Sequence, residues 1–84
     1  MMIIVYVIRS LKDGRFYVGM TNDLERRMQE HQSGKTKSTK AFRPWKLIFT
    51  ESYPSYLEAR KREKYLKSGS GKELIKKWPR SSTE

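Results

Sequence analysis

The chain has 84 residues and no cysteine, and its 19 lysines and arginines against 9 aspartates and glutamates give a formal net charge of +10. This length provides one hydrophobic core and no room for a second. The absence of cysteine excludes a disulfide framework and a cysteine-type zinc site, which fits a reducing, cytoplasmic setting. The positive charge favours a polyanionic partner, most often nucleic acid, through counterion release and electrostatic steering.

Other partners for so basic a chain are less favoured. A merely soluble basic surface or a ribosome-associated protein would carry the same charge. An acidic membrane surface is disfavoured, because no predicted helix is both basic and strongly apolar on its other face. The apolar start, residues 1–8, is too short to span a membrane and lacks a leading basic segment, so it predicts a strand rather than a signal peptide.

The first two predicted elements form a hairpin. Residues 3–9 are a continuous, largely β-branched run, which is typical of a strand covered on both faces. Asp13-Gly14 is the signal for a two-residue turn, and residues 16–20 are then the returning strand. In that register Tyr6 and Tyr17 emerge on the same face of the sheet. They stand about 13 Å apart along the strand, so one site can hold both only if a bulge, twist or leaning side chains shorten the gap.

The first helix follows the second strand directly. Asn22, with a glutamate three residues later, makes a start similar to a capping box, and Gly34 is a suitable C-terminal stop. Arg27 and His31 are one helical turn apart and share a side of this helix. Tyr17, Arg27 and the single histidine of the chain therefore gather in one local unit.

A basic loop and a third strand come next. The loop covers residues 35–44 and carries four basic residues, Lys35, Lys37, Lys40 and Arg43. In the strand, predicted over residues 45–50, Trp45, Leu47 and Phe49 alternate with the residues between them, as strand residues on one face do.

Two further helices complete the chain. Ser55 with a glutamate three residues later is a full capping box that opens a helix to about residue 68, where Gly69 closes it. Ser70 repeats the same box for a short last helix that Pro79 ends. The polar residues from Arg80 onward predict a flexible tail, residues 80–84.

The order of elements is β-β-α-β-α-α, which predicts an α+β fold. We expect a single domain over residues 1–79, in which helices flank a three-stranded antiparallel sheet. The first strand is the expected centre of the sheet, because it is apolar on both faces.

Glu63 lies at helical spacing with Tyr56, Ala59 and Leu66, on the stripe that a helix normally buries. An unpaired charge is costly there. One interpretation is a partly buried salt bridge to one of the many basic residues. The other is a metal ligand or an acid–base group in a cleft, since ionisable groups forced inward cluster at functional sites. The residues alone leave both interpretations open.

The other polar candidates also have ordinary interpretations. A tyrosine in a strand is usually a core ring with its hydroxyl at the edge. Arg27 could be one of many solvated arginines, and a lone His31 on a helix is more often a structural hydrogen-bond partner than a catalyst. Each of these signals is weak when taken alone.

Taken together, the residues resemble the GIY-YIG nuclease family. Ile4-Val5-Tyr6 matches the first motif, with Ile4 in place of its glycine, and Tyr17-Val18-Gly19 matches the second. Arg27 and Glu63 lie where the family has its arginine and its downstream acidic residue, and the resemblance covers about residues 3–75. Size and the basic loop make the chain most similar to the small stand-alone bacterial members, which are similar to the N-terminal nuclease domain of the excision-repair endonuclease.

The resemblance implies a metal-dependent endonuclease that hydrolyses phosphodiester bonds, with DNA favoured over RNA and with repair or recombination as its setting. Glu63 would hold one Mg²⁺ or Mn²⁺ together with waters and a phosphate oxygen. Arg27 would stabilise the transition state, and His31 would position the phosphate or the water. Tyr6 and Tyr17 form a pair, of which either one orients or deprotonates the attacking water. The nucleic-acid backbone would be held by Lys35, Lys37, Lys40 and Arg43.

Two rival functions remain at this point. The first is a non-catalytic nucleic-acid-binding module with a degenerate nuclease site, which would gain nothing from the inward carboxylate of Glu63. The second is a ribosome-associated structural protein, which needs none of the tyrosine, arginine and glutamate set. A chain of this size is also compatible with a homodimer or with a partner protein that supplies targeting.

Overall fold

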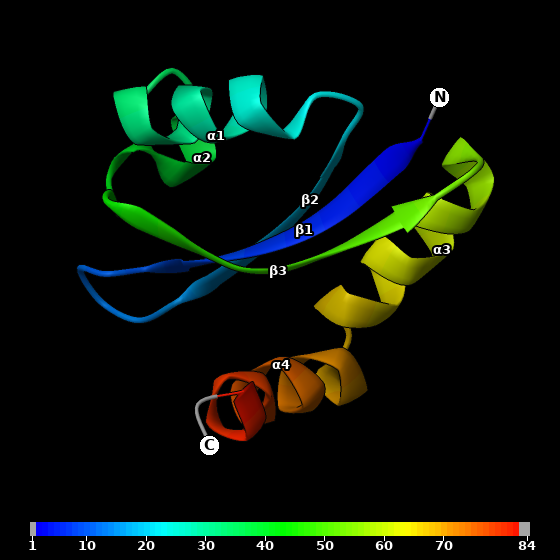
Figure 1. Cartoon of the computed structure of the whole chain (residues 1–84). Helices are drawn as coiled ribbons and strands as arrows, with labels where there is room; N and C mark the ends of the chain where they lie inside the picture. The colour runs from blue at the N-terminus through cyan, green and yellow to red at the C-terminus, as the bar shows by residue number, and fades with distance from the viewer. Residues whose placement is uncertain (1, 83–84) are drawn as a thin grey trace.

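The computed structural model describes residues 2–82 and has the expected α+β fold (Figure 1). One helix more than expected is present, because the predicted loop over residues 35–44 contains a short helix. In chain order the elements are β1 (Ile3–Ser10), β2 (Phe16–Thr21), α1 (Leu24–Ser33), α2 (Lys37–Lys40), β3 (Trp45–Tyr53), α3 (Tyr56–Lys67) and α4 (Gly69–Ser82). None of the helices described is long and apolar enough to cross a lipid bilayer.

The three strands form one antiparallel sheet in the order β2-β1-β3, which confirms the predicted central position of β1. The side chains of β1 alternate between the two faces, and both faces are fully buried. Val5 and Val7 point to one side, and Tyr6 and Ile8 to the other, all with no exposed surface. A strand that is apolar on both faces is stable only between two other strands and under two covering layers.

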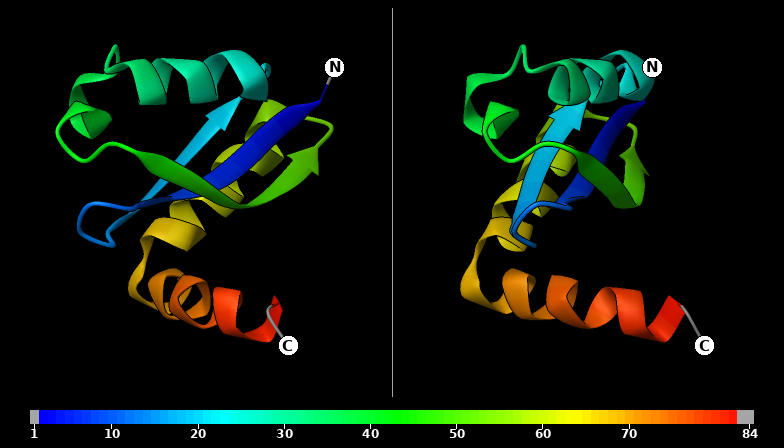
Figure 2. Two further views of the ribbon diagram at one scale, coloured as in Figure 1. Left: turned by 60° about the vertical axis from the view of Figure 1, so that its left-hand side comes forward. Right: turned by 90° about the vertical axis from the view of Figure 1, so that its left-hand side faces the viewer.

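The helices divide between the two faces of the sheet. Figure 1 shows α1 and α2 on one side and α3 and α4 on the other, and the two views of Figure 2 agree. On the α3 side, Val5, Val7, Val18 and Phe49 pack with buried residues of both helices. On the α1 side the smaller core comprises Tyr6, Ile8 and Trp45, covered by Tyr17, Leu24, Met28 and Phe42. The candidate residues Tyr6 and Tyr17 therefore belong to the layer under α1.

The hairpin register differs from the predicted one by two residues. Tyr6 pairs with Gly19, not with Thr21. The predicted two-residue turn is wrong, because the loop covers residues 11–14. Ser10 N–H donates to Arg15 O at 2.8 Å and closes this loop. Inside the loop, Ser10 Oγ accepts Lys12 N–H at 3.1 Å and Asp13 N–H at 3.2 Å. A side chain that satisfies loop amides in this way competes with the tight turn. The shift keeps both tyrosines on one face and halves their separation along the strand.

A β-bulge in β3 overturns the simple alternation predicted for that strand. Val7 pairs with Phe49 and Ile8 pairs with Leu47, so Ile48 is the extra residue. Because side chains alternate with a period of two, one extra residue sends Phe49 to the α3 side and leaves Trp45 on the α1 side. The bulge thus gives each core one large aromatic ring from the same strand.

Helix ends agree with the sequence only in part. Ser55 caps α3 as predicted, with its Oγ accepting Glu58 N–H at 3.3 Å. Gly34 ends α1 in the left-handed conformation at φ 87°, also as predicted. The N-cap of α1 is Asp23 rather than Asn22, because the Asp23 carboxylate accepts Arg26 N–H at 3.2 Å.

The last helix is longer than predicted at both ends. It begins at Gly69, so Ser70 does not cap it, and it continues through Pro79 to Ser82. The predicted end at Pro79 is wrong, because the helical backbone continues beyond it to Ser82. Residues 80–82, predicted as part of the tail, therefore belong to α4, and residues 83 and 84 lie outside the described residues.

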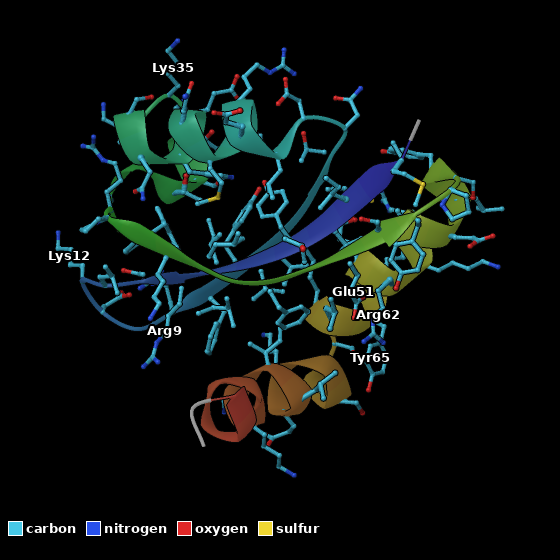
Figure 3. The ribbon with its side chains drawn as sticks, in the orientation of Figure 1. Arg9, Lys12, Lys35, Glu51, Arg62 and Tyr65 are labelled. Carbon is cyan, nitrogen blue, oxygen red and sulfur yellow. The ribbon has the colours of Figure 1, made fainter. Side chains whose placement is uncertain are left out.

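An ion pair fixes α3, the helix of Glu63, to the sheet. The guanidinium of Arg62 contacts both carboxylate oxygens of Glu51 at 2.8 and 3.1 Å, and Tyr53 donates to the same carboxylate at 2.9 Å. Figure 3 shows Glu51 and Arg62 pointing toward each other, with the Tyr65 ring beside the guanidinium. A planar, two-point contact of this kind sets the rotation of α3 relative to β3.

Candidate active site

Tyr6 lies across the backbone of Gly19 on the neighbouring strand. A Cβ atom at position 19 would stand 2.5 Å from Tyr6 Oη and 2.6 Å from Tyr6 Cζ, closer than carbon atoms approach. A glycine is therefore needed at position 19 because there is no room for a side chain, and not because the backbone conformation is unusual. The gap lets the Tyr6 ring reach the Tyr17 ring, with centroids 6.4 Å apart, so the predicted separation of about 13 Å does not occur.

The Tyr6 hydroxyl is completely buried and has two polar partners. His31 Nε2 is 2.8 Å from Tyr6 Oη, and Arg27 Nε donates to the same oxygen at 3.4 Å. Burial raises the pKa of Tyr6 to about 12, against the opposing effect of the Arg27 hydrogen bond. The charges of Tyr17 and Glu63 also raise this pKa. Tyr6 is thus a protonated phenol whose hydroxyl belongs to a fixed network.

His31 is also fully buried, and both ring nitrogens are in use. Its Nδ1 is 2.8 Å from Thr39 Oγ1, on the short helix α2. Burial, followed by the positive charge of Arg27, lowers the pKa of His31 to about 4, so the ring is neutral at pH 7. Both ring nitrogens are thus engaged within the protein. That His31 helps to position the phosphate or the water stays a prediction.

Tyr17 is the more accessible of the two tyrosines. Its half-buried ring packs edge-on against His31, with centroids 5.1 Å apart, and against Trp45 at 6.4 Å. Within the described part of the chain, no hydrogen bond occupies the Tyr17 hydroxyl. The two tyrosines, equivalent in the sequence, therefore differ in the structure: the hydroxyl of Tyr6 is bound within the protein, and that of Tyr17 is available.

Arg27 links this network to the solvent. Its side chain is 32% exposed, and its Nη1 donates to Glu30 Oε1 at 2.8 Å. The Glu30 hydrogen bond raises the pKa of Arg27, and the same bond lowers the pKa of Glu30. Sequence reasoning missed Glu30, although its position three residues after Arg27 on one helix is a usable signal.

Glu63 lies on α3, and its side chain is only 13% exposed, as its place on the buried stripe predicts. Its oxygens are paired with Lys67 Nζ at 3.2 Å and Arg60 Nε at 3.7 Å, so the salt-bridge interpretation is correct for this structure. Tyr56 does not share the burial of the stripe and is 60% exposed. Glu63 forms no hydrogen bond with the tyrosines or with Arg27, but it is near enough for its charge to act on Tyr6.

The donor set fits a metal held by few protein groups. No cluster of three or more aspartate, glutamate, histidine or cysteine side chains occurs among the described residues. Glu63 is near enough to Tyr6 for its charge to raise the pKa of that tyrosine. A hard cation such as Mg²⁺ accepts a single carboxylate when waters and substrate phosphate complete its shell, and Glu63 suits that mode of binding.

Three of the four predicted backbone-binding cations come together. Lys37, Lys40 and Arg43 line one hollow, which Lys12 joins from the β1–β2 loop. Lys35 instead lines a different hollow beside Glu30, and Figure 3 shows Lys35 at the end of α1 and Lys12 at the hairpin loop. Lys12 was missed because its neighbours in space are about 30 residues distant in sequence; it donates to Ala41 O at 3.3 Å. We refer to Lys12, Lys37, Lys40 and Arg43 as the basic hollow.

Comparison with known families supports one assignment for this geometry. The family model described as "GIY-YIG catalytic domain" matches residues 2–77, which include all the site residues described above.

Individual relatives agree in length as well as in sequence. The chain is similar to the UPF0213 protein YazA of Bacillus subtilis, with 43% identity over 82 residues, which cover 94% of this chain and 82% of the relative. It is similar to the UPF0213 protein SSP2268 of Staphylococcus saprophyticus, with 36% identity covering 86% of this chain and 88% of the relative. Among solved structures it resembles the solution NMR structure of the UPF0213 protein BH0048 from Bacillus halodurans, with a TM-score of 0.55, 38% identity and coverage of 89% and 82% of the two chains.

Proposed function

Because the chain belongs to the GIY-YIG family, we propose that it is a metal-dependent endonuclease that hydrolyses phosphodiester bonds in DNA. The observation that carries the proposal is the contiguous network of Tyr17, Tyr6, His31 and Arg27. This network keeps two polar groups available at its edge: the hydroxyl of Tyr17 and one end of the Arg27 guanidinium. A nuclease needs groups of these two kinds, one for the attacking water and one for the phosphate.

Arg27 is proposed to bind the scissile phosphate. Its Nε is bonded to Tyr6 and its Nη1 to Glu30, so the plane of the guanidinium is already oriented. Nη2 has no partner among the described residues and can donate to a phosphate oxygen. A preoriented cation lowers the free energy of the charge that develops on phosphorus, because it need not reorganise during the reaction.

Tyr17 is proposed to orient the attacking water and to accept its proton. Its exposure and the absence of a competing hydrogen bond support this choice over the buried Tyr6. A phenol is a weak base near neutral pH, with an ordinary pKa of about 10, so it depends on nearby positive charge. Mg²⁺ or Mn²⁺ bound by Glu63 would supply that charge and would stabilise the leaving 3′ oxygen as a Lewis acid.

The basic hollow is proposed to hold the nucleic-acid backbone beside the site. Its four cations face no carboxylate within the hollow, so their charges are available to phosphates. Such contacts orient the strand without reading its sequence. Branched and single-stranded DNA of the kinds produced in repair and recombination are the substrates of choice for a first test, since the resemblance includes an excision-repair nuclease domain.

The test is nicking of single-stranded, flap and branched DNA by the purified protein with Mg²⁺, with Mn²⁺ and with a chelator. Tyr17→Phe, Arg27→Ala and Glu63→Gln should each reduce cleavage at least about a hundredfold. Lys64→Ala, an exposed change on the same helix as Glu63, is the matched control and should retain full activity. Binding without cleavage on every substrate would instead support a non-catalytic nucleic-acid-binding module, and equal cleavage by all variants would indicate a contaminating nuclease.

A further inference from the structure

A chain of hydrogen bonds runs from Arg27 through Tyr6 and His31 to Thr39 on α2. We infer that Thr39 is a positioning residue: it holds His31 as the Nδ1-protonated tautomer, which in turn keeps a lone pair of Tyr6 Oη aimed at the Arg27 guanidinium. The tautomer of His31 does not depend on whether the protein cleaves DNA. Its consequence for catalysis rests on the proposed nuclease function, because Arg27 is the residue proposed to bind the phosphate.

The direction of each hydrogen bond follows from the number of protons available. Arg27 can only donate, so Tyr6 Oη accepts from it and must give its own single proton to another group. The remaining partner of that hydroxyl is His31 Nε2, at 2.8 Å, which is therefore the unprotonated nitrogen. In a neutral imidazole the proton then resides on Nδ1, which donates to Thr39 Oγ1 at 2.8 Å. Thr39 passes its hydroxyl proton to Thr36 O at 3.3 Å.

The opposite arrangement leaves a buried proton without an acceptor. If Thr39 donated to Nδ1, the Nε2–H of His31 would donate to Tyr6 Oη, which already accepts from Arg27. The Tyr6 hydroxyl proton would then have no acceptor in a site with no exposed surface. An unpaired donor in the interior is unfavourable, and no buried side-chain polar atom of the described residues lacks a partner in this structure.

Thr39 is held firmly enough for this role. It has no exposed surface, and its carbonyl oxygen accepts the indole N–H of Trp45 at 2.9 Å. The indole thereby ties α2 to the start of β3. Lys37 and Lys40, on the same four-residue helix, are exposed and line the basic hollow. One short helix thus presents a hydroxyl to the buried histidine and two cations to the surface.

The tautomer can be measured directly, because the sequence contains one histidine. Long-range ¹H–¹⁵N correlation spectra of the ¹⁵N-labelled protein at pH 7 distinguish a protonated Nδ1 from a protonated Nε2. We expect Nδ1 to be protonated and Nε2 to be unprotonated. A protonated Nε2, or a rapidly exchanging mixture of both forms, would overturn the inference. The measurement needs neither metal nor DNA.

Two variants of Thr39 distinguish a role in positioning His31 from a role in stabilising the fold. Thr39→Val keeps the shape and removes the hydroxyl, whereas Thr39→Ser keeps the hydroxyl. The valine variant should lose the Nδ1 preference and reduce kcat about tenfold with little change in KM, and the serine variant should restore both. Thr50→Val, an exposed change on β3, should alter neither. Folding of each variant is checked by its amide spectrum.

The outcomes for the tautomer and for cleavage are distinguishable. An unchanged tautomer in Thr39→Val contradicts the inference even when the wild-type protein cleaves DNA. Absence of cleavage by the wild-type protein contradicts the proposed function, while the Nδ1 tautomer and its loss in Thr39→Val would still support the positioning role of Thr39.

Discussion

The ring of Tyr6 lies over the backbone of Gly19, and this contact brings the Tyr6 hydroxyl within 2.8 Å of His31 Nε2. The position of Gly19 opposite Tyr6 depends on the four-residue hairpin loop, because a two-residue turn would place Thr21 there. One loop conformation, set by the Ser10 side chain, therefore decides whether the two motifs of the family can form one site.

Gly19→Ala should destabilise the protein and break the Tyr6–His31 hydrogen bond. The added methyl group would stand 2.5 Å from Tyr6 Oη, and displacement of a buried ring costs about 1–3 kcal/mol. Chemical denaturation measures the loss of stability. Gly69→Ala is the control, since a Cβ there meets nothing within 4 Å, and it should change stability by at most about 1 kcal/mol. Equal effects of the two changes would contradict the packing argument.

Glu30→Gln should strengthen DNA binding. The substitution removes the carboxylate that pairs with Arg27 Nη1 at 2.8 Å, and so releases that nitrogen for a phosphate. We expect an affinity gain of about threefold at low salt, from fluorescence anisotropy with labelled DNA, because partly exposed ion pairs are worth little individually. Glu25→Gln, on the exposed side of the same helix, changes net charge by the same amount. A gain as large in Glu25→Gln would attribute the effect to net charge alone.

The basic hollow should account for a measurable part of the salt dependence of DNA binding. Lys12→Gln and Lys40→Gln should each weaken binding and reduce the slope of log affinity against log salt by about one. Lys35→Gln should change the slope much less, because Lys35 lines another hollow beside Glu30. If Lys35 had the largest effect, the nucleic acid would follow a path across α1 rather than the basic hollow.

Stability should fall as pH decreases from about 6.5, before most carboxylates titrate. The pKa of His31 is lowered from 6.5 in the unfolded chain to about 4 in the folded protein. Only the unfolded state gains a proton between these two pH values. The contribution of His31 to the free energy of unfolding is therefore complete above pH 6.5 and is lost progressively toward pH 4. The loss by pH 5 should be about 2 kcal/mol in urea unfolding. His31→Gln should lack this dependence, and a flat wild-type profile between pH 7 and 5 would contradict the burial of a neutral imidazole.

Glu51→Gln should destabilise the protein by about 1–2 kcal/mol, because it breaks the two-point contact that joins β3 to α3 and leaves Arg62 unpaired. Thermal unfolding followed by circular dichroism provides the measurement. Glu73→Gln removes an equal charge from an exposed position with a 3.8 Å ion pair and should have an effect within about 0.5 kcal/mol. A similar loss in both variants would assign the effect to net charge rather than to the contact.

Features that depend on neighbouring residues could be predicted from the sequence alone. The apolar run of β1 indicated a central strand, and Ser55 and Gly34 marked helix ends, since caps and strand patterns act within a few residues. The resemblance to the GIY-YIG family selected Tyr6, Tyr17, Arg27, His31 and Glu63. The structure brings the first four into one network and pairs Glu63 with Lys67 and Arg60 instead.

The differences between those residues depend on how the strands and helices pack against one another. The Ser10 side chain set the hairpin register, Ile48 formed the bulge, and α2 brought Thr39 to His31. The bulge exists only where β3 pairs with β1, and the Thr39–His31 contact joins two separate helices, so no local pattern records either one. For the same reason the sequence could not separate a buried Tyr6 from an accessible Tyr17. Their exposure is a property of the packed layers on the α1 side of the sheet.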